Sequence, residues 1–254
     1  SDGDRQTLIV LSGDGTVNEV INGIVYLGQT ELGYIPLGSS NDLARGLELP
    51  SDPEKALFSI LNAPARPVDI GCVRYGGRTR RFIVSSGFGF DASVCHQVMV
   101  SRLKPLLNRL HLGKLTYAGV ALQLLFFLRP HSMQMILDGQ EKISFHGVYF
   151  AAAMNLPFEG GGFKFCPHAD CRDGKLNIIV VSGLSKLKVL LLLPTAFFGL
   201  HTRFHGVHTY TCHSAEFLSA AELPVHTDGE PVLRQQRMMV RLENEKLLMK
   251  IINK

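Results

Sequence analysis

Apolar and polar positions along the first third of the chain follow the periods of strands and helices in turn. The run TLIVLS at 7–12 has almost no polar interruption and predicts a strand buried on both faces. Residues 16–27 then place valines and isoleucines at helical spacing. A second strand is expected at 32–38, a second helix in SSNDLARGL at 39–47, and a third helix at 52–64. This order predicts an α/β domain.

After Pro67 short apolar runs alternate with glycine-containing turns, which is typical of an antiparallel sheet. Amphipathic helices are expected at about 97–128 and about 185–200. We therefore predict a three-layer α/β domain at 1–66 and a β-rich, sandwich-like domain with inserted helices at 67–254. The chain enters a strand almost at once and has no initial Met, so we expect the upstream part of the first domain to be missing. The extreme C-terminus is a candidate to pack back on that domain.

Composition narrows the function classes. The chain of 254 residues is 46% hydrophobic, which excludes disorder, and its formal charge of +4 is too small to predict that it wraps a nucleic acid. The five cysteines are odd in number and widely spaced, which favours a reduced, cytoplasmic protein. The most apolar segment, 187–200, contains Pro194 and is shorter than the roughly 20 residues that a spanning helix needs. It predicts a buried or interfacial helix.

The stretch LSGDGT at 11–16 joins the first predicted strand to the first predicted helix. Glycines at 13 and 15 allow a ligand to approach the backbone, and the helix N-terminus presents free N–H groups to anionic oxygens. Thr16 adds a hydroxyl donor. Asp14 suits a phosphate site only if a divalent cation lies between them. A tight turn with Asp14 as a helix cap is the alternative reading of these residues alone.

The stretch IPLGSSNDLAR at 35–45 repeats this arrangement. A strand ends at Gly38, and Ser39, Ser40 or Asn41 can cap a helix that contains Asp42. The carboxyl ends of neighbouring parallel strands open on one crevice, so the two loops are expected to face each other. Asp69, at the predicted domain junction, is a third carboxylate that could approach this crevice.

Five motifs together resemble the diacylglycerol kinase catalytic family of soluble lipid kinases. In chain order they are SGDGTVNEVINGI at 12–24, IPLGSSNDLAR at 35–45, SGFGFDA at 86–92, NLPFEGGGFKFCPHADCRDGKL at 155–176 and DGEP at 228–231. The match covers nearly the whole chain. It implies phosphoryl transfer from ATP to a lipid hydroxyl, most of all diacylglycerol, with the nucleotide bound by the α/β domain and the lipid by the β-rich domain.

The resemblance also implies residue roles. The nucleotide phosphates would contact Ser12, Gly13, Asp14, Gly15, Thr16, Gly38, Ser39 and Asn41, and Asp14, Asp42 and Asp69 would organise a water-linked Mg²⁺ network. Asp228 would be the general base for the lipid hydroxyl, with Glu230 beside it, and Asp173 matches a position that holds a structural Mg²⁺ in some members. The chain departs from the family at Ser12, usually Gly, at Ser39, usually Thr, and in lacking the upstream Asn-Pro strand end.

Three other patterns in the sequence could indicate a site. Cys166, His168 and Cys171 have no second Cys/His pair with zinc-site spacing. The glycines at 160–162 are not followed by a Lys-Ser/Thr pair, so they are expected to shape a loop at the domain interface. The helix at 97–128 mixes basic residues with leucines, which suits either an ordinary amphipathic helix over the β core or contact with an anionic membrane.

The sequence therefore predicts an ATP- and Mg²⁺-dependent lipid kinase that associates peripherally with membranes. A sphingosine-type or other lipid-alcohol acceptor remains open, as do an NAD kinase-like enzyme and a lipid-binding regulator without catalysis. The expected partner is the lipid substrate at a membrane surface, with no nucleic acid, and a homodimer is left open.

Overall fold

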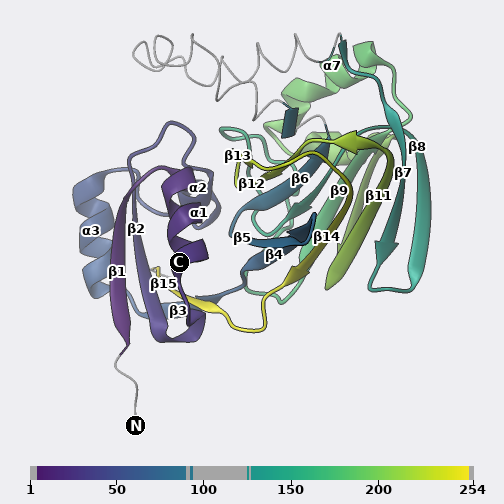
Figure 1. The fold of residues 1–254 in the computed structure, drawn as a ribbon. Coiled ribbons are helices and arrows are strands. Elements are labelled where there is room, and N and C mark those ends of the chain that lie inside the picture. The colour runs from purple at the N-terminus through teal and green to yellow at the C-terminus, as the bar shows by residue number, and fades with distance from the viewer. Residues whose placement is uncertain (1–4, 90–91, 94–124, 126, 252–254) are drawn as a thin grey trace.

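The computed structural model describes residues 5–89, 92–93, 125 and 127–251. Its ribbon shows a smaller α/β part that holds the N-terminus and a larger part made almost entirely of strands (Figure 1). The predicted fold class, an α/β domain followed by a β-rich sandwich-like domain, is confirmed.

The smaller part is built on a four-stranded sheet of order β1-β2-β15-β3. Its strands are β1 (Gln6–Ser12), β2 (Thr30–Pro36), β15 (Leu247–Lys250) and β3 (Ala65–Val68). The first three are parallel and β3 is antiparallel to β15. The helical elements are α1 (Asp14–Gly23), η1 (Leu27–Gln29), α2 (Asp42–Gly46) and α3 (Pro53–Asn62). Figure 1 places α3 on one side of the sheet and α1 on the side that faces the β-rich part.

The position of β15 ties the last described strand to the first domain. It lies between β2 and β3, where Leu248 pairs with Glu31 and Leu247 pairs with Val68, both far earlier in the chain (Figure 1). The sheet also continues through Ala65–Val68, so the predicted boundary after residue 66 falls within β3. The boundary itself stays a prediction.

One strand prediction was wrong. The first strand was expected to be buried on both faces, but in β1 Leu8, Ile9 and Leu11 are exposed and Val10 is buried. The reason is position: β1 is an edge strand of the described sheet and pairs there with β2 alone. A continuous apolar run is typical of a central strand, but it does not show whether the strand has a neighbour on each side in the sheet.

The larger part contains eleven strands on one curled sheet. They are β4 (Gly71–Tyr75), β5 (Arg78–Phe82), β6 (Ser85–Gly89), β7 (His131–Leu137), β8 (Glu141–Met154), β9 (Leu176–Ser182), β10 (Val207–Cys212), β11 (Ser214–Leu223), β12 (Val225–Thr227), β13 (Glu230–Pro231) and β14 (Gln235–Leu242). Alternate residues point to an inner core that includes Phe88, Met135, Phe217 and Met238. Burying these large side chains is the main source of this domain's stability.

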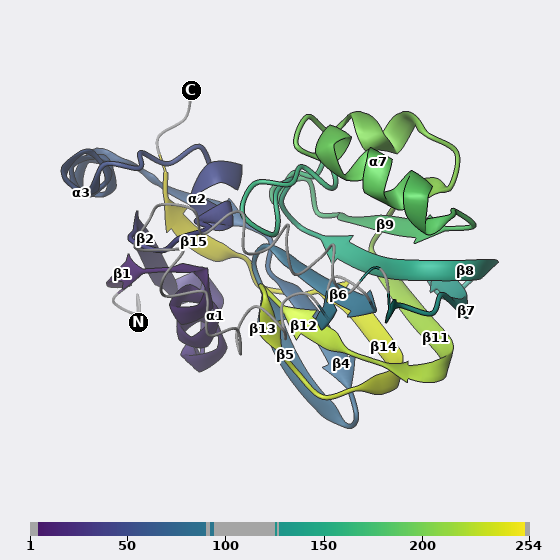
Figure 2. The ribbon, with the colours of Figure 1, turned by 90° about the horizontal axis from the view of Figure 1, so that it is seen from above.

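The second predicted inserted helix is α7 (Lys186–Ala196), followed by η2 (Leu200–Arg203), and it lies beside β9 (Figure 2). Ser185 caps α7 by accepting a hydrogen bond from the Lys188 N–H at 3.3 Å. The helix predicted at 97–128 falls almost wholly outside the described residues. In the part of the chain that the structure describes, no helix has the length and apolar character needed to cross a bilayer.

Candidate active site

A cavity of about 220 Å³ lies where the two parts meet. It is enclosed by the loops that follow β1 and β2, the start of β6, the loop that follows β8, and the turn between β12 and β13. Its lining residues are Gly13, Asp14, Gly15, Gly38, Ser39, Ser40, Asp42, Val84, Ser85, Glu159, Gly160, Asp228, Gly229 and Glu230. The structure thus brings together eight of the predicted site residues from segments far apart in the sequence.

The two glycine-containing loops touch each other at the cavity wall. A Cβ atom added to Gly38 would lie 2.7 Å from the Cα of Gly13, so neither loop leaves room for a side chain there. Helix α1 begins directly after Gly13, and no side chain caps its N-terminus. Its first N–H groups are therefore available to an anionic ligand, as the sequence predicted for a phosphate site.

Asp14 caps the helix of the other loop rather than its own. Its carboxylate accepts hydrogen bonds from the backbone N–H of Asp42 at 2.8 Å and of Leu43 at 3.4 Å, and from the hydroxyl of Tyr34 at 3.2 Å. None of the three candidate capping residues takes this role at the start of α2: Asn41, in left-handed backbone conformation, makes no capping bond. Burial raises the pKa of Asp14, and these donors oppose that rise.

Asp42 is buried at the floor of the cavity and links both parts of the molecule. Its Oδ1 pairs with Arg45 at 2.5 Å, and its Oδ2 accepts a hydrogen bond from the Gly161 N–H at 2.7 Å. Gly161, the middle one of the three glycines, therefore lies where the loop after β8 contacts the smaller part. Burial, together with the nearby charges of Asp14 and Glu159, raises the pKa of Asp42 to about 7.

This raised pKa predicts a pH-dependent stability. The folded protein binds the Asp42 proton more tightly than the unfolded chain, so the contribution is present below about pH 4 and is lost as the pH rises through about 7. Without divalent cations, the unfolding free energy of the wild type should fall relative to Asp42→Asn by roughly 2–4 kcal/mol between pH 4.5 and 7.5. Urea unfolding across this range measures the difference, and a constant difference would contradict the assignment.

Asp228 is buried and accepts four hydrogen bonds. Its Oδ1 accepts from the backbone N–H groups of Val84 and Ser85 at 2.8 and 2.9 Å. Its Oδ2 accepts from the Ile83 N–H at 2.9 Å and from the Asn18 side chain at 2.8 Å. Burial raises the pKa of Asp228 to about 6, and the four hydrogen-bond donors oppose this rise.

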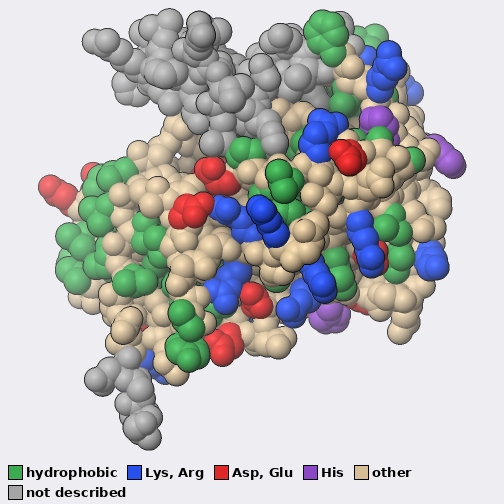
Figure 3. All heavy atoms as spheres, viewed as in Figure 1, with side chains coloured by type: hydrophobic (Ala, Val, Ile, Leu, Met, Phe, Trp, Pro, Cys, Tyr) green, Lys and Arg blue, Asp and Glu red, His purple; other side chains and the backbone are tan. Residues whose placement is uncertain are grey.

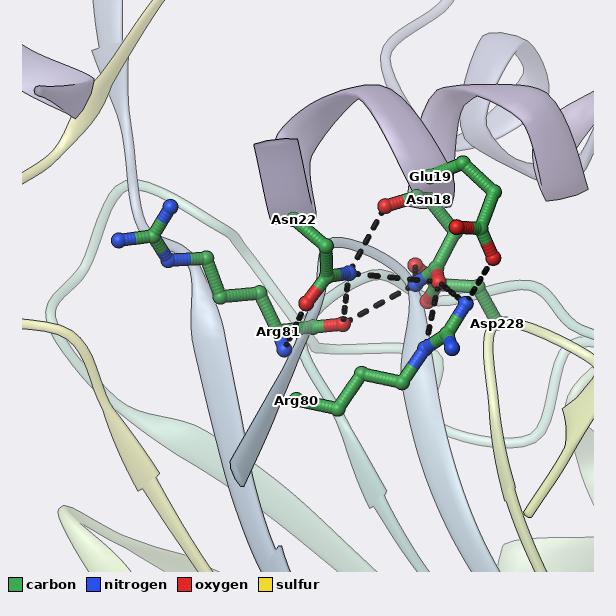
Figure 4. A network of polar contacts seen from close by, with 6 residues as sticks. All are labelled: Asn18, Glu19, Asn22, Arg80, Arg81 and Asp228. Atoms are coloured by element: carbon green, nitrogen blue, oxygen red, sulfur yellow. Dashed lines mark hydrogen bonds and ion pairs between the residues drawn. The ribbon is translucent and has the colours of Figure 1, made fainter. Parts of the chain in front are cut away.

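A polar network joins α1 to the β-rich part around Asp228 (Figure 4). The amide of Asn18 donates to the Arg81 carbonyl oxygen at 3.0 Å as well as to Asp228, and its oxygen accepts from Arg80. One turn later, Asn22 accepts from the Arg81 N–H at 2.8 Å. Neither amide was among the site residues predicted from the sequence. Their i, i+4 spacing, which places two amides on one face of the predicted helix, is the signal that could have found them.

Glu230, two residues after Asp228, lies against the loop that follows β1. A Cβ atom added to Gly15 would lie 2.3 Å from its Oε1, so this glycine is required for the carboxylate to sit there. Among the described residues, the Glu230 side chain has no hydrogen-bond or ion-pair partner, although its backbone pairs with Thr227 between β12 and β13. Its carboxylate is thus available beside the N-terminus of α1.

Five predicted residues do not line the cavity: Ser12, Thr16, Asn41, Asp69 and Asp173. The first three flank it within the two loops. Asp69 instead pairs with Lys246 at 2.8 Å and accepts from the Gly174 N–H at 2.8 Å, so it braces a loop of the β-rich part. Asp173 accepts from the Lys175 N–H in an exposed turn.

Asp69 thus lies outside the cavity lining with its carboxylate paired to Lys246, and the water-linked Mg²⁺ network of Asp14, Asp42 and Asp69 stays a prediction. The structural Mg²⁺ site at Asp173 stays a prediction. The described residues hold no group of three or more His, Cys, Asp or Glu that could bind a metal directly.

All the charged residues that line the cavity are acidic. Asp14, Asp42, Glu159, Asp228 and Glu230 are acidic, and the same lining contains no Lys or Arg. A phosphate bound between the two glycine loops would meet strong repulsion unless a cation lay between it and these carboxylates. The donor set therefore fits a nucleotide that enters with Mg²⁺, held through the phosphates and water.

Two family models match the chain. Residues 1–73 match the diacylglycerol kinase catalytic domain, and residues 83–243 match the YegS C-terminal NAD kinase beta sandwich-like domain. Together they span both parts of the structure and all five acidic lining residues.

Individual proteins agree with these matches. The chain is 31% identical over 227 residues to "Putative lipid kinase YtlR" of Bacillus subtilis (strain 168), covering 88% of this chain and 73% of that one. It is 30% identical over 226 residues to the diacylglycerol kinase of the same organism, covering 88% and 70%. The fold is similar to that of a diacylglycerol kinase from Bacillus anthracis str. Sterne, with a TM-score of 0.70 at 20% identity over 97% of this chain and 76% of that chain.

Proposed function

This chain belongs to the diacylglycerol kinase catalytic family, and we propose that it is an ATP- and Mg²⁺-dependent kinase that phosphorylates the hydroxyl of a lipid alcohol, with diacylglycerol as the acceptor. The observation that carries the proposal is the cavity itself. Two touching glycine loops and a free helix N-terminus offer a phosphate cradle, and five carboxylates face it.

The chemistry of phosphoryl transfer suits these parts, because it depends mainly on positioning and on neutralising charge. The α1 N-terminus and the loops at Gly13 and Gly38 would hold the nucleotide phosphates. Asp14 and Asp42 would hold the cation through water. When bound, Mg²⁺ would neutralise negative charge on the transferred group.

The proton of the acceptor hydroxyl needs a base. The family resemblance assigns this role to Asp228. Each of the two oxygens of that carboxylate already accepts two hydrogen bonds. For Asp228 to take the proton, one of these four donors would be released when the lipid hydroxyl binds. Glu230, beside the same turn and with free acceptor capacity, is the second candidate.

The direct test is an assay of the protein, extended upstream of Ser1 where its gene encodes more, with labelled ATP and mixed micelles. We expect labelled phosphatidic acid from diacylglycerol, dependent on Mg²⁺ and lost in Asp14→Asn. A panel with sphingosine, other lipid alcohols and NAD separates the remaining kinases. No labelled product from any member would contradict the proposal and favour a lipid-binding regulator.

A lipid kinase must collect its substrate from a membrane, and α7 offers a surface for this. Leu187, Leu191 and Phe198 are 65%, 66% and 76% exposed, one helical turn apart or just beyond the helix end. Lys188 and Arg203 are exposed on the same segment. Figure 3 shows hydrophobic and basic side chains close together at the upper right, where α7 lies. We propose that this surface contacts anionic bilayers.

Replacing Leu191 and Phe198 together by Ser should weaken binding to vesicles of phosphatidylglycerol and phosphatidylcholine about tenfold or more, because inserting each side chain contributes on the order of 1.5–3 kcal/mol. Both side chains are exposed, so the unfolding free energy should change little. Vesicle sedimentation measures the binding. Phe58→Ser is the control, since Phe58 is 69% exposed on α3 and outside this surface. Equal binding by all three proteins would contradict the assignment.

A further inference from the structure

A buried pair of side chains beside the cavity is unexplained by the site described so far. Glu159, from the loop after β8, lines the cavity, and its Oε1 lies 2.8 Å from the Nε2 of His226 on β12. Glu159 is 5% exposed and His226 is fully buried. A charged group held this far from water needs partners for its oxygens.

The hydrogen bonds fix the protonation of His226. Its Nδ1 accepts from the Gly229 N–H at 3.1 Å, so this nitrogen carries a lone pair and the ring proton is on Nε2. That proton is donated to Glu159. The imidazole is therefore neutral, and the pair is a hydrogen bond from a neutral ring to a carboxylate. His226 thus links the Glu159 carboxylate to Gly229 in the turn that carries Asp228.

The backbone around Glu159 is equally well defined. Its N–H donates to the Phe163 carbonyl oxygen at 2.9 Å, and the Phe163 N–H donates back at 3.0 Å. The three glycines between them all have positive φ, which closes the loop tightly. Both ends of the Glu159 side chain are thus fixed by the loop and by His226.

The second carboxylate oxygen of Glu159 has no hydrogen-bond partner among the described residues. This atom, Oε2, is buried. Leaving a buried charged acceptor unpaired is costly, so a donor is expected from outside the protein chain. The oxygens of Asp14, Asp42 and Asp228 in the same cavity are already bonded, which sets Glu159 apart from them.

We propose that Glu159, positioned by His226, recognises the headgroup of the acceptor by taking through Oε2 a hydrogen bond from a donor other than the hydroxyl that is phosphorylated. This inference rests on the proposed lipid kinase function and deepens it. Diacylglycerol has no such second donor, whereas the glycerol of a monoacylglycerol has a second free hydroxyl. Glu159 therefore widens the acceptor range toward lipid alcohols with a further donor.

The test compares kcat/KM for 1-monoacylglycerol with kcat/KM for 1,2-diacylglycerol of matched acyl chain, in mixed micelles with ATP and Mg²⁺. The ratio of the two values does not depend on the fraction of folded enzyme. In Glu159→Gln we expect the monoacyl-to-diacyl ratio to fall at least tenfold, because an amide replaces the charged acceptor; a tenfold change corresponds to about 1.4 kcal/mol. Glu54→Gln, exposed on α3, should leave the ratio unchanged.

His226 supplies a second pair of variants. His226→Gln retains an N–H donor for Glu159 and should keep the ratio within about threefold of the wild type, whereas His226→Leu removes the donor and should lower the ratio as Glu159→Gln does.

The outcomes separate the inference from the function on which it rests. A wild type that phosphorylates no lipid of the panel contradicts the proposed function. A wild type that phosphorylates diacylglycerol but not monoacylglycerol, or an unchanged ratio in Glu159→Gln, overturns the role of Glu159 alone.

Discussion

Replacing Asp228 with asparagine is expected to lower kcat at least 10²-fold and the unfolding free energy by about 2–4 kcal/mol. The amide keeps one acceptor oxygen for two of the four donors and turns an NH₂ group toward the Ile83 N–H and Asn18. Each buried donor left without an acceptor costs roughly 1–3 kcal/mol, and loss of a general base alone costs about 10²–10⁴ in rate. Urea unfolding and steady-state kinetics with ATP and diacylglycerol measure the two effects.

The chain provides a matched control in Asp138. This residue also has positive φ and accepts two backbone N–H bonds, from His213 and Ser214, but it lies in an exposed turn between β7 and β8. Asp138→Asn should cost about 1 kcal/mol or less and leave kcat unchanged. If Asp228→Asn retained wild-type kcat within threefold, Asp228 would have no part in the chemistry.

Much of the site was predictable because its residues follow strong local patterns. Gly13 directly follows β1 and Gly38 lies two residues after the end of β2. Parallel strands place their carboxyl ends on one edge of the sheet, so the meeting of the two loops follows from chain order. The turn at Asp228 could be located only by its resemblance to the family motif, since nothing local indicates that β12 crosses to this cavity.

Asp69 shows why sequence position alone misplaces a side chain. It follows a strand of the first domain, as a crevice residue would, but β15 returns beside β3 and brings Lys246 within 2.8 Å of the Asp69 carboxylate. That pairing depends on a contact between residues far apart in the chain. The same holds for Glu159 and His226: each looks like an isolated polar residue, and only the packing of the loop after β8 against β12 makes them a pair.

Replacing Asp14 with asparagine is expected to lower kcat/KM for ATP about 10³-fold, with a smaller loss of stability. The Asp14 carboxylate caps α2 through the Asp42 and Leu43 N–H groups and faces the proposed phosphate site. The amide removes the negative charge that would hold the cation. Its NH₂ group also cannot accept the hydrogen bonds that these two N–H groups donate. Loss of one group that stabilises charge in a transition state typically costs about 10²–10³ in rate, and weaker cation binding adds to this. Kinetics at several Mg²⁺ concentrations measure both terms.

Tyr34→Phe separates the charge of Asp14 from its surroundings. The Tyr34 hydroxyl donates to Asp14 Oδ1 at 3.2 Å, and its removal leaves the carboxylate and both backbone donors in place. One neutral hydrogen bond contributes about 1 kcal/mol, so this variant should lose less than about tenfold in kcat/KM. Raising Mg²⁺ should recover part of the activity of Asp14→Asn and none of the smaller loss in Tyr34→Phe, because only the first variant weakens the hold on the cation. Equal losses in the two variants would mean that Asp14 acts through packing rather than through its charge.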